Sequence, residues 1–144
     1  MVSVETLMLR VDAAGRWSYR RARATPPPGE SPDETARALA GVAAGDAATV
    51  VHSTSWRHEP GGTIVLTYAV CPDPAPWLPA TEVPVLEIAR GEAPATPSPE
   101  LISVANVVAH AVRHLAFLMA EDPVVAQVLG RHPGLARALE PALA

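Results

Sequence analysis

Apolar residues in the first half of the chain alternate with polar ones or gather in short β-branched runs, a pattern typical of strands. Residues 4–11 and 16–24 are separated by a turn that ends at Gly15, and we predict that they pair as a β-hairpin. Residues 48–58 and 63–71 are rich in β-branched and aromatic side chains and are joined by a Glu-Pro-Gly-Gly turn. This pattern predicts a second hairpin.

Helix signals lie between and after these hairpins. Ser31 is the expected N-cap of a helix near 32–44, with Pro32 at its first position and Glu34 completing a capping box. The glycines near the end of this segment are the expected stops.

The C-terminal third is predicted to be helical. A long helix over 100–121 has no breaker inside it, a second helix restarts after Asp122 and ends at Gly130, and a last turn covers 134–139. The expected fold class is therefore α+β. It has a mainly antiparallel or mixed sheet, one capped helix, a long C-terminal helix and short tail helices, all in a single domain over 1–144.

The composition excludes several chemistries. The chain of 144 residues has no lysine, and its 11 positive charges are all arginine. Together with abundant Ala, Pro, Gly and Val this is typical of a GC-rich bacterial genome, and it rules out a Schiff-base, phosphate-loop or general-base lysine. Cys71 is the one cysteine, so the chain forms no intrachain disulfide and no cysteine-rich metal site.

Charge and hydropathy limit the expected partners. The net charge of −4 argues against a nucleic-acid partner. The chain begins without the regions of a signal peptide, and polar and charged residues interrupt its longest apolar run, 101–120. We therefore expect a cytoplasmic protein with no membrane association.

Arginine and aromatic residues are concentrated near the N-terminus. Five of the 11 arginines fall within the first 23 residues. In the second strand Trp17, Tyr19, Arg21 and Arg23 share one face by the two-residue period, so they could stack on and clamp an anionic ligand. We favour a half-buried strand whose arginines reach solvent, and keep a small anionic ligand among the candidate partners.

The end of the third predicted strand, HSTSWRHE, carries the densest chemistry. The two-residue period predicts that His52, Thr54, Trp56 and His58 share one strand face, with Arg57 on the other. A serine nucleophile needs a histidine base beside it, but neighbouring serine and histidine side chains in a strand point to opposite faces. The chain also has no Gly-x-Ser-x-Gly motif. We expect no catalytic serine, and take the histidines, Trp56 and Arg57 as candidate ligand-binding residues.

Two further histidines lie one helical turn apart. His110 and His114 have the spacing that can present two imidazoles to one metal ion. The zinc-protease motif needs a glutamate directly after the first histidine, and Ala111 stands there. A third ligand could come from His52, His58 or Glu121. We favour local hydrogen bonding on the helix flank, so we expect no metal and no cofactor, and add both histidines to the candidate ligand-binding residues.

Residues 29–45, GESPDETARALAGVAAG, resemble the Nudix box, which often opens Gly-Glu-Ser-Pro and closes on a glycine. The resemblance covers roughly residues 1–71 and implies a Nudix-like scaffold. In that family the box carboxylates hold a divalent metal at a pyrophosphate. The matching positions here are apolar: Ala38, Leu39, Val42 and Ala43. The resemblance thus implies that the metal-dependent hydrolysis is lost.

The long helix predicts a homodimer. One apolar stripe should pack on the sheet, and Ile102, Ala109, Ala116 and Ala120 make the far flank apolar as well. The tail helices are too short to cover that flank, so we expect a second copy of the chain to cover the rest.

Three classes of function remain open. The favoured one is a non-catalytic small-molecule-binding or protein-interaction domain, on a catalytically degenerate Nudix-like scaffold. The second is an enzyme acting on an anionic substrate through arginines and the histidines at 52, 58, 110 and 114. The third is an assembly subunit that docks through its C-terminal helices.

Overall fold

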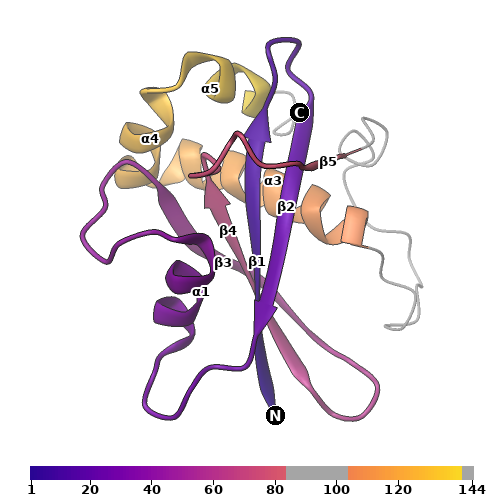
Figure 1. Cartoon of the computed structure of the whole chain (residues 1–144). Coiled ribbons are helices and arrows are strands. Elements are labelled where there is room, and N and C mark those ends of the chain that lie inside the picture. Colours follow the sequence, from indigo (N-terminus) through magenta and orange to yellow (C-terminus); the bar gives the residue numbers. More distant parts are fainter. Residues whose placement is uncertain (84–103, 141–144) are drawn as a thin grey trace.

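The computed structural model describes residues 1–83 and 104–140. These residues form a five-stranded mixed sheet and four helices, an α+β fold as predicted (Figure 1). The strands are β1 Val2–Val11, β2 Trp17–Ala24, β3 Val50–His58, β4 Ile64–Cys71 and β5 Thr81–Glu82. The helices are α1 Pro32–Ala40, α3 Val104–Glu121, α4 Pro123–Gly130 and α5 Pro133–Leu139.

The sheet joins the two predicted hairpins side by side. Its strand order is β3-β4-β1-β2-β5, with β1–β2 and β3–β4 antiparallel as expected. The hairpins meet through β1 and β4, which run parallel. The nine-residue β3 therefore forms one edge of the sheet, and the two-residue β5 pairs with β2 at the other.

Helix α1 has the predicted start and an earlier end. Ser31 accepts a hydrogen bond from the backbone N–H of Glu34, and the Glu34 side chain accepts one from the N–H of Ser31, completing the capping box. Of the predicted segment near 32–44, the helix covers the part up to Ala40, because Gly41 adopts a left-handed conformation with φ 74° and terminates it. Only the first of the two candidate glycine stops is used.

Replacing Ser31 by alanine should lower the free energy of unfolding by about 1 kcal/mol, because one N-terminal backbone donor loses its acceptor. Ser31→Asp keeps an acceptor oxygen and should stay close to the native protein. Urea denaturation measures both. An equal loss of unfolding free energy in the two variants would show that the cap hydrogen bond does not stabilise the fold.

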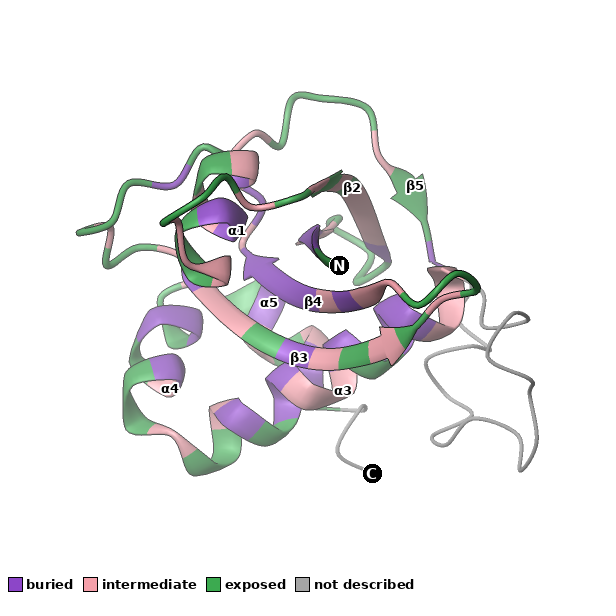
Figure 2. Cartoon of the chain, turned by 90° about the horizontal axis from the view of Figure 1, so that it is seen from below, coloured by how far each residue is buried: buried purple, intermediate pink, exposed green. Residues whose placement is uncertain are grey.

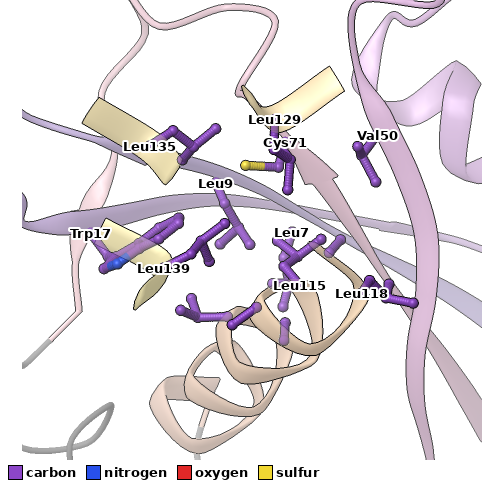
Figure 3. Close-up of a cluster of buried hydrophobic side chains, with 14 of the residues drawn as sticks. Leu7, Leu9, Trp17, Val50, Cys71, Leu115, Leu118, Leu129, Leu135 and Leu139 are labelled. Carbon is purple, nitrogen blue, oxygen red and sulfur yellow. The ribbon is translucent and has the colours of Figure 1, made fainter. Parts of the chain in front are cut away.

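The main core lies between the sheet and the three C-terminal helices. In Figure 2 α1 lies on one side of the curved sheet, and α3 and α4 lie on the other. Figure 3 shows side chains from β1 and from the C-terminal helices converging on that second side. The fully buried leucines at its centre are Leu7, Leu9, Leu115, Leu129 and Leu139. We call this side of the sheet the α3 face and the opposite side the α1 face.

The far flank of α3 is partly covered within one chain. Ala109 is 2% exposed and Ala116 is fully buried, while α4 and α5 both pack against α3. Ala120 is exposed, and Ile102 lies outside the described residues. The tail helices therefore cover part of this flank, and the homodimer stays a prediction.

The helices of the described part include none with the length and apolar character needed to cross a bilayer.

Candidate functional site

A β-bulge in β3 divides the predicted site residues between the two faces of the sheet. Ser53 pairs with Tyr68 and Ser55 with Thr67, which leaves Thr54 as an extra residue. The prediction that the residues at 52, 54, 56 and 58 share one face is wrong, because an extra residue reverses the alternation beyond it. His52 precedes the bulge, and its side chain lies on the α3 face.

Three predicted histidines do come together on the α3 face. The ring centroid of His52, in β3, lies 5.7 Å from that of His114 in α3. His110, one turn earlier in α3, stacks on His114 with 6.2 Å between the ring centroids. The Phe117 ring centroid lies 6.3 Å from that of His114. We call His52, His114 and His110 the histidine row.

The outer histidines of the row hydrogen-bond to the backbone of the bulge. His52 Nδ1 lies 2.8 Å from the carbonyl oxygen of Ser53, and His110 Nε2 lies 3.2 Å from that of Thr54. Since carbonyls only accept, both ring nitrogens donate. Within residues 1–83 and 104–140, no group of three or more His, Cys, Asp or Glu side chains is placed to hold a metal ion.

The residues after the bulge are separated from the histidine row. Trp56 and His58 lie on the α1 face, where their rings meet edge to face 5.5 Å apart and Trp56 is 64% exposed. Arg57 lies on the α3 face, but it is bonded to Glu5. The six predicted site residues thus occupy three separate places in the fold.

Glu5 is the centre of a buried ionic cluster on the α3 face. Its carboxylate is 1% exposed and accepts two hydrogen bonds from Arg57, one from Arg21 and one from Thr67. Burial alone would raise the pKa of Glu5, but the bonds from Arg57 and Arg21 outweigh it and lower this pKa to about 2. Glu5 therefore stays ionised at any ordinary pH.

The shared face predicted for β2 is confirmed, but its arginines are held by carboxylates of the same chain. Trp17 enters the core and Tyr19 packs beside it, as the alternation requires. Arg21 binds Glu5, and Arg23 binds Glu59 through two hydrogen bonds of 2.6 and 2.8 Å. A ligand at these arginines would have to displace a carboxylate.

A second ionic cluster, which the sequence did not reveal, lies on the α1 face. The Asp73 carboxylate is fully buried and is shared by Arg20 and Arg10, with N–O distances of 2.7 and 3.3 Å. Burial acts to raise the pKa of Asp73, but the hydrogen bonds from Arg20 and from the N–H of Ala75, with the charges of both arginines, lower it overall. Two cations thus share one anion.

The Arg10 side of this cluster lines a pocket. The pocket has a volume of about 380 Å³ and lies between the end of β1, the 72–76 loop and the start of α5. We call it the Arg10 pocket. Apolar groups of Val11, Pro72, Pro76 and Leu135 line it, and the polar groups include Arg10, His132 and Asp12. None of the six predicted site residues is among its lining.

A second pocket of about 310 Å³ lies between the start of β3 and α4 and includes His52. Valines form much of its lining, while Arg37 and Arg131 are balanced by Asp46 and Asp122. Its charges therefore cancel. The Arg10 pocket is lined by one arginine and two carboxylates, and both of these carboxylates, Asp12 and Asp73, are paired with arginines that lie outside the lining.

The segment that resembles the Nudix box folds as a loop, a capped helix and a closing turn. Val42 is buried against Met8 and Val70 of the sheet, so its role there is packing. The two acidic residues of the helix have hydrogen-bond partners within the chain. Glu34 completes the capping box, and Asp33 accepts a hydrogen bond from the Tyr68 hydroxyl.

Comparison with protein-family models, with curated proteins and with solved structures found no match for this chain.

Proposed function

We propose that the chain is a non-catalytic binding domain that holds a small anionic molecule in the Arg10 pocket. The observation that carries the proposal is the unequal sharing of Asp73. Arg20, outside the lining, makes three of the four arginine hydrogen bonds to Asp73, so the charge of Arg10 at the wall of the pocket is only partly neutralised. Asp12, the other carboxylate there, is paired with Arg16, which also lies 3.8 Å from Glu82.

The guanidinium of Arg10 is held in place before any ligand arrives. Its Nη1 donates to Asp73 Oδ2 at 3.3 Å and to the carbonyl oxygen of Pro76 at 2.7 Å. A fixed donor loses little conformational entropy on binding, which favours affinity. The remaining guanidinium N–H groups can meet a carboxylate or phosphate oxygen.

The pocket lining indicates the class of ligand. Apolar groups of Val11, Pro76 and Leu135 favour a compact apolar body, and the cationic wall favours one acidic group. The His132 imidazole at the rim can donate a second hydrogen bond. A small organic acid or phosphate ester fits this description.

The enzyme alternative has less support. The outer imidazoles of the histidine row bind backbone carbonyls, and burial raises the pKa of the Cys71 thiol and keeps it protonated. Four predictions from the sequence remain proposals. They are a degenerate Nudix-like scaffold, a cytoplasmic location, a homodimer and docking through the C-terminal helices.

Isothermal titration with a panel of small carboxylates and phosphates tests the proposal. The native protein should bind at least one member, and Arg10→Gln should weaken that binding roughly tenfold or more, because a hydrogen bond to a charged group contributes about 1.5–3 kcal/mol. Arg23→Gln is the matched control and should bind normally, because Arg23 binds Glu59 and is not among the residues that line the Arg10 pocket. Equal affinity in the native protein and the folded Arg10→Gln variant would overturn the proposal.

A further inference from the structure

The histidine row joins α3 to the edge strand of the sheet. It places one imidazole of β3 and two of α3 in line, with His114 in the middle and half-buried. The two outer rings bond to consecutive carbonyls of the bulge, and the bond from His110 to Thr54 joins α3 to β3. Like charges that arise in this row are therefore held with their ring centroids 5.7 and 6.2 Å apart.

The elements packed against α3 supply no neutralising charge to His114. Strands β3 and β4 and helices α4 and α5 contact α3, and side chains of β1 and β2 share its core. The other ionisable residues of α3, of these elements and of their caps are Glu5, Arg10, Asp12, Tyr19, Arg20, Arg21, Arg23, Arg57, His58, Tyr68, Cys71, Arg113, Glu121, Asp122, Arg131, His132, Arg137 and Glu140. None of them is among the influences on His114. Burial first, and then the charges of His52 and His110, lower the pKa of His114 below 6.5.

We propose that the histidine row is a proton-sensing contact, which holds α3 on β3 while its imidazoles are neutral and weakens when they become protonated. This inference does not depend on the ligand proposed above, because the row and the Arg10 pocket share no residue.

The direction of the effect follows from proton binding. Because the pKa of His114 is lower in the folded protein than in the unfolded chain, the unfolded chain binds more protons when the pH falls below 6.5. The contribution of His114 is fully present above that value and is lost as the pH falls through the folded pKa. The pKa of Glu5 is about 2, so this carboxylate stays ionised across that range.

Urea denaturation at about pH 7.5 and about pH 5.5 tests the proposal in this imidazole range. The native protein should lose stability on acidification, and His114→Gln, which cannot be charged, should lose clearly less. His58→Gln is the matched control, since His58 is exposed on the α1 face, and it should behave like the native protein. An equal loss in His114→Gln and the native protein would overturn the proposal.

A second measurement needs no variant. In a proton NMR titration of the native protein, the His114 imidazole should titrate below the ordinary value of 6.5. A midpoint at or above that value would show that the histidine row does not disfavour protonation of His114, and it would also overturn the proposal.

Discussion

Glu5→Gln should destabilise the fold by about 3–5 kcal/mol, because it leaves Arg57 and Arg21, which are partly buried, without their buried counter-charge. The native carboxylate is 1% exposed and receives bonds from Arg57 and Arg21, so water cannot replace it. Urea denaturation near neutral pH measures the loss. Glu59→Gln is the matched control, since Glu59 is about one-third exposed, and it should lose less than about 1 kcal/mol.

The difference in stability between the native protein and Glu5→Gln should depend on pH with a defined sign. Glu5 has a pKa of about 2 in the fold against 4.5 ordinarily, so its contribution is complete above 4.5 and is lost as the pH falls toward 2. The difference between the native protein and Glu5→Gln should therefore narrow over that range. A difference that stays constant would show that the carboxylate charge is not what stabilises the cluster.

Asp73→Asn should have a comparable effect, with a loss of about 3–5 kcal/mol, because two arginines then face each other without a buried anion between them. It should also alter ligand binding, since Asp73 both neutralises Arg10 in part and fixes it beside the pocket. Thermal unfolding and titration calorimetry measure the two effects.

Asp46→Asn is the control for that variant. Asp46 accepts a hydrogen bond from the N–H of Ala48 in a loop, which an asparagine oxygen can also accept, so the change should stay within about 0.5 kcal/mol. If Asp73→Asn were as harmless as this control, the Asp73 cluster would not be a determinant of either the fold or the pocket.

The parts of the fold that were predicted correctly are determined by neighbouring residues. A glycine-containing turn between two β-branched runs is sufficient for each hairpin, and Ser31 with Glu34 is sufficient for the start of α1. Asp122 is likewise the N-cap that the sequence predicted for α4. These signals act within a few residues, so the sequence alone reveals them.

The candidate site was harder to predict because its determinants are distant in sequence. The carbonyl of Thr54 in the bulge accepts a hydrogen bond from His110, 56 positions away. No local sequence pattern predicts the extra residue. Glu5 and Arg57 are separated by 52 positions, so the sequence could suggest a clamp of free arginines where the fold has an internal ion pair. The two-residue period remains valid on either side of the bulge.

The Asp73 cluster was missed, and the extent of the covering of α3 could not be predicted, for a related reason. Asp73 lies just beyond β4 in a proline-rich loop, where an acidic residue is ordinarily solvated. Its burial depends on Arg20 from another strand. How much of the apolar flank of α3 the helices α4 and α5 cover depends on the turns between helices, which helical periodicity does not describe.

The most direct test of the proposed binding function is a ¹H–¹⁵N NMR titration of the native protein with a small carboxylate and, separately, with inorganic phosphate. We expect saturable chemical-shift changes at the Arg10 side chain and at the amides of Val11, Gly134 and Leu135, which line the pocket. Shifts that never saturate, or that map to the pocket beside His52 instead, would contradict it.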